Sequence, residues 1–315
     1  MQAAVAREYG GPEVLDVVKR PRPRARAGEV VVRVVAAAVA SGDARLRAAR
    51  FPAGFAWPSR LVFGLRRLRR PVLGMAFSGV VEALGEGASV LSVGDAVCGM
   101  TGLRMGAHAE YVAVAARRLV QVPHGVSHAD AAGVLFGGTT ALHFLRGKGQ
   151  VRPGMTVLVN GASGAVGTNA VQWARRQGAV VTGVCSAANG ALVADLGASE
   201  VIDYARTPLT ALTQRYDLVL DTVGNLDPER GRRLLTERGV LILAVATLGQ
   251  TLRARGNLIA GPAAERPEDF ALLLREVAEG RLRVIHDGAF RLADIRAAHR
   301  RVDSGRKVGN VLVCP

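Results

Sequence analysis

The chain has 315 residues, of which 49% are apolar and 21% are charged, so it can bury a core without disulfides. At about 100–200 residues per domain, this length predicts about two domains. The formal net charge is +15, and all but three of the 41 basic residues are arginine. The high apolar fraction excludes a disordered chain.

The cysteines exclude two further classes of protein. Cys98, Cys185 and Cys314 are odd in number and far apart, so neither a disulfide scaffold nor a CxxC zinc ribbon fits. No apolar stretch reaches the ~18 residues of a membrane-spanning helix, and the first ten residues lack the apolar core of a signal peptide. We therefore expect a protein of the reducing cytoplasm, with no membrane partner.

The positive charge raises the question of nucleic-acid binding. Its densest run is Arg66-Arg67-Leu68-Arg69-Arg70, which has no interleaved aromatic residue to stack on bases. The other arginines are scattered. This pattern favours a solvated or substrate-attracting basic surface over a nucleic-acid interface.

The first 120 residues or so are rich in short β-type runs separated by glycine. A β-branched run follows Gly28, residues 77–84 read as a strand, and the Gly94-Asp95 turn leads into another. Closely spaced strands with such turns indicate a small barrel.

From about residue 125, helices alternate with short apolar strands. The expected strands are 156–159, 180–185, 218–221 and 240–243, with helices reaching residue 176 and near 190–196. This alternation predicts a parallel sheet covered on both faces. Residues 309–313 form one more strand.

A small-residue loop between the first of these strands and its helix carries the main functional signal. Gly161 permits a tight turn, Gly164 lets the backbone approach a pyrophosphate, and Gly167 lets the helix pack closely. Free N–H groups and the positive helix end then face the phosphates. The candidate cofactor-binding residues are Gly161, Ala162, Ser163, Gly164, Ala165, Val166 and Gly167.

Two other loop chemistries do not fit these residues. A Walker loop needs a Gly-Lys-Ser/Thr ending, and a hydrolase elbow needs a glycine where Ala165 stands. A plain βα turn remains an alternative.

The tip of the next strand bears on the choice of cofactor. Residues 185–189 contain no Asp or Glu, whereas an acid there would bind the ribose of NAD and repel a 2′-phosphate. Ser186 and Asn189 can donate hydrogen bonds to that phosphate. NADPH is therefore favoured over NADH, although both residues suit an ordinary turn and helix cap.

These segments resemble the zinc-independent quinone oxidoreductase branch of the medium-chain dehydrogenase/reductase superfamily. Residues 79–97, 161–167 and 198–204 carry the resemblance, and residues 305–311 are similar to the final strand of the family. The resemblance implies an α/β protein with a GroES-like β-barrel domain (1–122, completed by 286–315). It also implies a Rossmann domain with a doubly wound parallel sheet (123–285) and a cofactor in the cleft between the domains.

The zinc-dependent members hold their metal with Cys, His and Cys. The matching positions here are Ala40, Met75 and Phe136, which offer no zinc donor set. Independently, His108, His124, His128 and His143 have no cysteine partner at ligand spacing. We expect no metal, and the separate structural-zinc lobe is also absent.

Without a Lewis acid, the expected chemistry is hydride transfer from NADPH to a small-molecule electrophile, a quinone or an α,β-unsaturated carbonyl. Ser41, beside the lost ligand position, is the candidate proton donor, with solvent or a plain turn role as alternatives. The resemblance further implies cofactor contacts by Thr140, Tyr204, Thr222, Val223, Gly224, Ala244 and Val245.

Three departures from the family weaken this interpretation: Ala40 and Ala76 replace polar residues, and Ala187 and Ala188 replace a basic one. An alcohol or aldehyde dehydrogenase, or a nucleotide-binding protein with little catalysis, remains an alternative. The resemblance also suggests a homodimer joined through edge strands of the Rossmann sheet.

Overall fold

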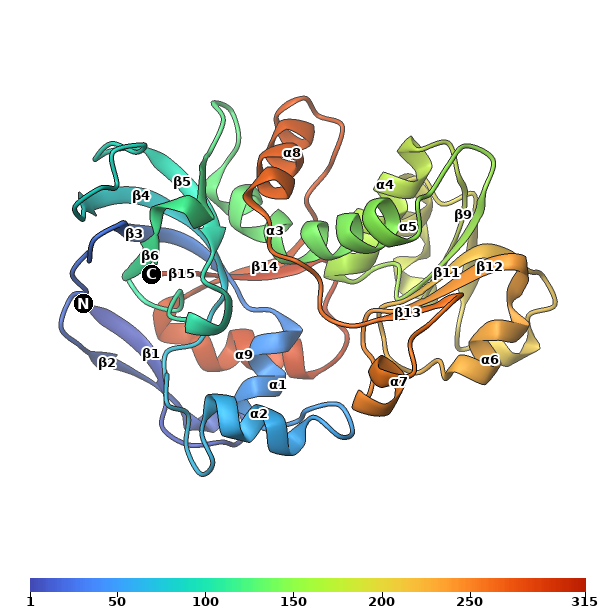
Figure 1. Ribbon diagram of the computed structural model, residues 1–315, viewed down its shortest axis with the longest axis horizontal. Helices are drawn as coiled ribbons and strands as arrows, with labels where there is room; N and C mark the ends of the chain where they lie inside the picture. Colours follow the sequence, from blue (N-terminus) through green and yellow to red (C-terminus); the bar gives the residue numbers. More distant parts are fainter. The chain divides into compact units, whose positions relative to one another are not determined.

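A computed structural model describes all of residues 1–315, which form two compact units. The barrel unit comprises Met1–Phe51, Ala56–Phe136 and Glu265–Pro315. The parallel-sheet unit comprises Pro52–Phe55 and Gly137–Ala264. Both chain ends lie in the barrel unit, which is therefore blue to green and red in Figure 1.

The barrel unit is built mainly from antiparallel strands. Its larger sheet has the order β14-β15-β3-β4-β5-β7, with β6 also paired to β3, while β1 and β2 form a separate ribbon. Only β14 and β15 run parallel. The strands are β1 (Gln2–Ala6), β2 (Leu15–Lys19), β3 (Glu29–Ala38), β4 (Ala76–Leu84), β5 (Ala96–Met100), β6 (Tyr111–Ala115), β7 (Leu119–Gln121), β14 (His286–Arg291) and β15 (Asn310–Cys314).

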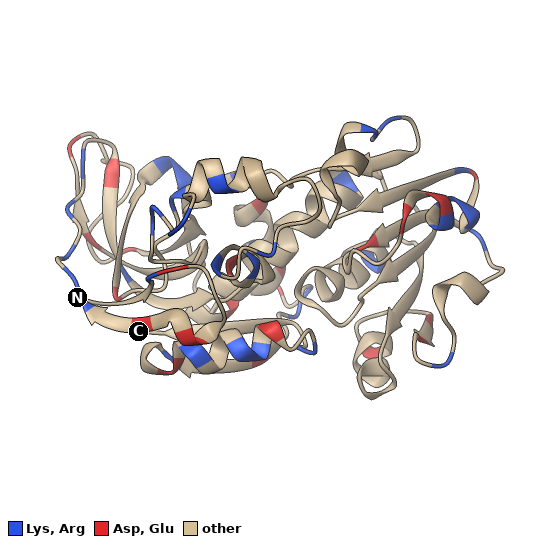
Figure 2. Ribbon diagram, turned by 90° about the horizontal axis from the view of Figure 1, so that it is seen from below, with Lys and Arg blue, Asp and Glu red and all other residues tan.

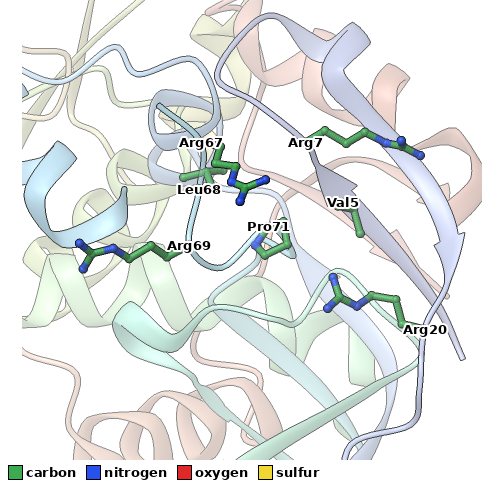
Figure 3. Close-up of a pocket in the computed structure, with 7 residues that line it drawn as sticks. All are labelled: Val5, Arg7, Arg20, Arg67, Leu68, Arg69 and Pro71. Carbon is green, nitrogen blue, oxygen red and sulfur yellow. The ribbon is translucent and has the colours of Figure 1, made fainter. Parts of the chain in front are cut away.

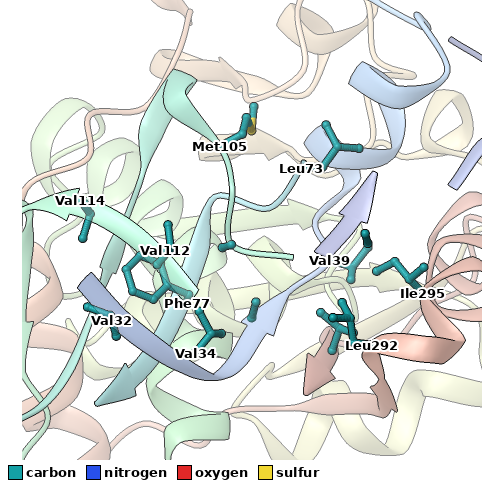
Figure 4. Packing of buried hydrophobic residues seen from close by; sticks show 14 of the residues in the cluster. Val32, Val34, Val39, Leu73, Phe77, Met105, Val112, Val114, Leu292 and Ile295 are labelled. Atoms are coloured by element: carbon teal, nitrogen blue, oxygen red, sulfur yellow. The ribbon is translucent and has the colours of Figure 1, made fainter. Parts of the chain in front are cut away.

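The barrel core joins residues from both ends of the chain. Figure 4 shows Phe77 of β4 among Val32, Val34 and Val112, with Leu292 and Ile295 nearby. Alternation along the strands directs the phenylalanine and valine side chains inward, whereas Leu292 and Ile295 lie in the turn before the last helix and at its start. The helices of this unit are α1 (Ser41–Arg47), α2 (Ala56–Phe63), α8 (Pro267–Ala278) and α9 (Ile295–Asp303), with the first part of α3 (His128–Leu142).

The parallel-sheet unit has six strands in the order β10-β9-β8-β11-β12-β13, and every pair is parallel. The strands are β8 (Thr156–Asn160), β9 (Val180–Cys185), β10 (Glu200–Asp203), β11 (Tyr216–Asp221), β12 (Leu235–Leu243) and β13 (Leu258–Ala260). Its helices are α4 (Ala165–Arg176), α5 (Gly190–Asp195), α6 (Pro228–Arg233) and α7 (Leu248–Leu252).

This strand order is that of the Rossmann fold, in which the first three strands are added toward one edge of the sheet and the next three toward the other. The predicted fold class, a GroES-like barrel with a Rossmann sheet, is confirmed. The switch point lies between β8 and β11. Ligands of such sheets bind outside the carboxyl ends of the strands at this point.

The compact units have different limits from the expected domains. The barrel unit extends to Phe136 and resumes at Glu265, rather than at 122 and 286. Two contacts account for this. His128 of α3 lies 2.7 Å from the Ser78 hydroxyl, and α8 packs against β7.

No helix is both long enough and apolar enough to cross a membrane. The basic residues are distributed over both units rather than confined to one, as Figure 2 shows.

Candidate functional site

A buried polar network occupies the switch point of the parallel sheet. Asn160 ends β8 and donates through Nδ2 to the Oδ1 of Asp221, at the end of β11, at 2.8 Å. The same carboxylate accepts the backbone N–H groups of Val223, Gly224 and Leu226. Asp221 is fully buried, so these four donors compensate for its desolvation. The network fixes the turn that follows β11.

The glycine loop begins beside this turn. Gly161 has a φ of +84°, and a Cβ there would lie 2.5 Å from the Thr222 hydroxyl oxygen. Its N–H and that of Ala162 both donate to Val184 O, at 3.0 and 2.9 Å. Only glycine can adopt this positive φ and also leave room for the Thr222 hydroxyl. The loop therefore turns tightly against β9 and β11.

Gly164 and Gly167 have different surroundings. A Cβ at Gly167 would lie 2.1 Å from Gly161 O, so this glycine is required for α4 to pack on the loop. A Cβ at Gly164 would meet only Gly161 O, at 3.4 Å, which leaves its outer face open. No side chain caps α4, so its first N–H groups, from Ala165 onward, point outward. The loop thus offers an open cradle of N–H donors.

The residues that follow β9 are hydrogen-bonded to the glycine loop. Asn189 donates through Nδ2 to the Ser163 hydroxyl at 3.0 Å, and its N–H donates to Ser186 O. Ser186 and Asn189 are half-buried, whereas Ala187 and Ala188 are exposed. The structure therefore brings the residues of the tip beside the glycine loop.

An acid lies closer to this tip than the sequence reading assumed. Asp203, the last residue of β10, is the register partner of Cys185, the last residue of β9. Burial, and secondarily the Asp203 charge, raises the pKa of the Cys185 thiol. The sequence analysis considered only the end of β9 and therefore missed this acid on the neighbouring strand. Asp203 stands beside Tyr204 in residues 198–204, which carry the family resemblance.

Tyr204 and Arg206 follow in the same loop. Tyr204 donates its N–H to Cys185 O at 3.2 Å, and its side chain is 57% exposed. The Arg206 N–H donates to Asp203 O at 3.1 Å, its side chain is exposed, and it forms no ion pair. Arg206 is therefore an unneutralised charge near the strand tip that the sequence analysis did not single out.

The remaining predicted contacts lie at the same edge of the sheet. Thr222 donates its hydroxyl to Asn160 O at 2.7 Å, and Val223 is half-exposed. Ala244 donates its N–H to Asp221 O at 2.9 Å, while Val245 packs on Gly224. These residues form a mostly apolar border around the ends of β11 and β12.

Thr140 lies near the end of α3 and is half-buried. Three residues earlier, Gly137 packs on the start of α4, because a Cβ there would lie 2.2 Å from Ala165 O. This close contact sets the C-terminal part of α3 beside the first turn of α4.

Ser41 belongs to the barrel unit and opens α1, directly after Ala40. The buried Asp43 holds this region together, because its carboxylate accepts the N–H of Ala40 at 2.8 Å and that of Gly74 at 3.1 Å. Burial raises the pKa of Asp43, while the nearby His108 and these two hydrogen bonds oppose the shift. Asp43 is a positioning residue that the sequence analysis did not single out.

The positions that match the zinc ligands do not fit zinc. Ala40 and Phe136 carry no donor atom, and Met75 carries only a thioether. The structure also has no group of three or more His, Cys, Asp or Glu side chains placed to hold a metal ion. Ala76, a further departure from the family, is buried in the barrel.

Two family models match the chain. A model described as "Alcohol dehydrogenase GroES-like domain" matches residues 26–124, and one described as "Zinc-binding dehydrogenase" matches residues 196–313. Together they cover segments of both units.

Known proteins match over the full length. A quinone oxidoreductase of Pseudomonas aeruginosa is 30% identical over 98% of this chain and 97% of its own. A 2-haloacrylate reductase of Burkholderia is 29% identical over 100% and 99% of the two chains. The solved quinone oxidoreductase of Coxiella burnetii superposes with a TM-score of 0.89 at 27% identity, covering 100% of this chain and 99% of that one.

Proposed function

The chain belongs to the quinone oxidoreductase-like branch of the medium-chain dehydrogenase/reductase superfamily, an oxidoreductase family, and on this premise we propose that it transfers a hydride from NADPH to a quinone or an α,β-unsaturated carbonyl. The observation that carries the proposal is the open cradle at the start of α4. A quinone oxidoreductase and a 2-haloacrylate reductase among the relatives support an acceptor with an activated double bond.

The described residues fit a dinucleotide. Gly164 presents an open face, and the uncapped N-terminus of α4 supplies N–H donors and a partial positive charge to a pyrophosphate. Thr222, Val223, Ala244 and Val245 would border the nicotinamide at the strand ends, and Thr140 would contact its ribose. The glycine loop would bind and orient the cofactor rather than react with it.

Bound NADPH would supply the hydride. The acceptor takes up this hydride and one proton, and its conjugated system spreads the charge that develops. The apolar border formed by Val223, Ala244 and Val245 excludes water from the reacting carbon. The proton comes from solvent or from the hydroxyl of Ser41.

The proposed reaction does not use zinc, because Ala40, Met75 and Phe136 do not form a zinc donor set. This favours acceptors that stabilise negative charge themselves over simple alcohols, whose oxidation would lose the assistance of a Lewis acid. A panel of quinones and enones against a panel of alcohols, with NADPH consumption or NADP⁺ reduction as readout, tests this choice. Turnover of alcohols alone would contradict it. Binding of NADPH without turnover of any acceptor would favour the nucleotide-binding alternative.

The preference for NADPH depends on charges near the tip of β9. Asp203 disfavours a 2′-phosphate, whereas Tyr204, Ser186 and Asn189 provide donors for it. We assign the missing positive charge to Arg206, which follows Tyr204 in the loop and has no acidic partner.

Two substitutions with opposite expected effects on NADPH affinity test this assignment. We expect Arg206→Glu to weaken NADPH binding about tenfold while leaving NADH nearly unchanged, because a 2′-phosphate loses one ion pair and gains a repulsion. Asp203→Asn should strengthen NADPH binding about threefold, because it removes a repulsion. Fluorescence titration with both nucleotides measures these shifts.

Arg255→Glu is the matched control, since Arg255 is exposed and precedes β13 at the amino edge of the same sheet. Equal effects of Arg255→Glu and Arg206→Glu would show that overall charge, not Arg206, governs the affinity. Tighter binding of NADH than NADPH by the unmodified protein would overturn the cofactor proposal.

A further inference from the structure

The barrel unit contains an arginine pocket, defined by Val5, Arg7, Arg20, Arg67, Leu68, Arg69 and Pro71, with a volume of about 700 Å³. We propose that this pocket binds a phosphate group of a ligand other than the dinucleotide of the parallel-sheet unit. Its volume lies within the range of small-molecule sites, about 300–1,000 Å³. Arg67 and Arg69 of the dense arginine run line the pocket. The proposed hydride transfer does not use this pocket.

The pocket has a fixed backbone. Leu68 is only 5% exposed and packs in the barrel core, so the arginines on either side of it are held at the surface. Ala6 N–H donates to Pro71 O at 2.8 Å, and Val5 forms a bridge with Val72. The Arg69 N–H donates to Phe63 O at 2.8 Å. The arginine run is therefore fastened to β1 rather than lying in a free loop.

The charges of the pocket are largely unneutralised. Arg7 pairs through Nε with Asp16 at 3.1 Å, and Asp16 also pairs with Arg296 at 2.6 Å. Arg20, Arg67 and Arg69 form no ion pair with any acid. No acidic residue lines the pocket. Positive charges gathered without a counter-charge repel one another, so an anion bound there relieves the repulsion.

The side chains converge from separate segments. Figure 3 shows the guanidinium groups of Arg20 and Arg67 turned toward Pro71, whereas those of Arg7 and Arg69 point outward. Arg20 follows β2, and its N–H donates to Met1 O at 2.9 Å, which fixes it beside the start of β1. Arg20 and Arg67 are therefore the two residues best placed to hold a ligand group over the floor of the pocket.

A phosphate matches this arrangement better than other anions. It carries up to two negative charges on three oxygens, so it can accept hydrogen bonds from two guanidinium groups at once, whereas a carboxylate carries one charge. No aromatic side chain lines the pocket, so a stacked base is not part of the recognition. The group can belong to a soluble phosphate compound or to a lipid headgroup.

The test uses the full-length protein with pyrophosphate as the soluble probe. Isothermal titration should detect binding that Arg20→Gln/Arg67→Gln weakens at least about tenfold, since charge-assisted hydrogen bonds to two guanidinium groups are lost. Arg24→Gln/Arg117→Gln is the control, because both are exposed arginines of the barrel unit outside the pocket and the change in net charge is the same. Thermal unfolding verifies that both double variants fold.

Hydrogen exchange separates this pocket from the glycine loop, which also suits pyrophosphate. Protection of residues 2–6 and 66–72 supports the proposal, whereas protection confined to 161–167 overturns it. NADPH affinity should be the same in the pocket variant and its control.

A second arm uses vesicles of phosphatidylglycerol against vesicles of phosphatidylcholine. Vesicle binding that the pocket variant loses and the control keeps identifies the phosphate as that of a lipid headgroup. Loss of pyrophosphate binding without any vesicle binding identifies a soluble phosphate compound. If neither probe binds, or if both double variants lose binding equally, the proposal is wrong.

Discussion

His299 of α9 is fully buried, and neither of its ring nitrogens has a hydrogen-bond partner. Its ring lies edge-on to that of His108, with centroids 5.6 Å apart, and the guanidinium of the buried Arg47 lies nearby. Burial, then the His108 and Arg47 charges, hold the pKa of His299 well below its usual value of 6.5. The folded protein therefore keeps this side chain neutral.

This shift predicts loss of stability in acid. Below about pH 6.5 the unfolded chain binds a proton at residue 299 that the folded protein does not, so the free energy of unfolding falls by up to about 1.4 kcal/mol per pH unit. Substituting His299→Leu removes this dependence, which urea unfolding between pH 7.5 and 5 would measure. His124→Leu, at an exposed position, serves as the control. An unchanged pH slope in His299→Leu would contradict the prediction.

A second prediction at the scale of single residues concerns the contribution of Asp43 to stability. Its two carboxylate oxygens accept buried N–H groups from Ala40 and Gly74, so Asp43→Asn places an amide N–H₂ against one of these donors. We expect a loss of about 1–3 kcal/mol in unfolding free energy. Urea denaturation measures it, with Asp294→Asn at the exposed side of the barrel unit as control. A loss no larger than that of the control would count against a positioning role.

At the scale of elements, two glycines at the start of α4 have different roles: Gly167 is needed for packing, and Gly164 leaves space for a ligand. Gly167→Ala should lower stability by about 1–3 kcal/mol and also weaken NADPH binding, because its Cβ would lie 2.1 Å from Gly161 O and displace α4. Gly164→Ala should weaken NADPH binding at least about tenfold with little loss of stability, since its Cβ only fills the open face.

Gly147→Ala is the control, because a Cβ there would meet nothing within 4 Å. Thermal unfolding and nucleotide titration measure the two effects separately. Undiminished NADPH binding by Gly164→Ala would show that the pyrophosphate does not lie against this glycine.

The elements themselves were largely predictable. The apolar runs at 156–159, 180–185 and 218–221 correspond to β8, β9 and β11, and the helix reaching residue 176 is α4. These predictions rest on the spacing of apolar residues along the chain, which differs between strands and helices. The unanticipated limits of the units arise where α3 and α8 contact strands far away in the sequence.

At the scale of the whole molecule, the parallel sheet has two edge strands, β10 and β13. Unpaired backbone groups at an edge can pair with a second copy, and we expect a homodimer joined there. Light scattering should then give twice the chain mass of 33.0 kDa. Amide exchange in residues 258–260 should slow as protein concentration rises, because a β13 interface would bury those groups. A mass of one chain at every concentration would overturn this expectation.

The sequence by itself determined the alternation of strands and helices, the Rossmann-type loop and the family, because each depends on local spacing of residues. Only the tertiary structure placed Asp203 beside Cys185 and joined Asn189 to Ser163, since register and loop packing bring together residues distant in the chain. It likewise gathered Arg20 and Arg67 into one pocket. In the sequence Arg20 is one of the scattered arginines and lies far from the dense run that contains Arg67. Their convergence depends on how the strands and loops that carry them pack in space.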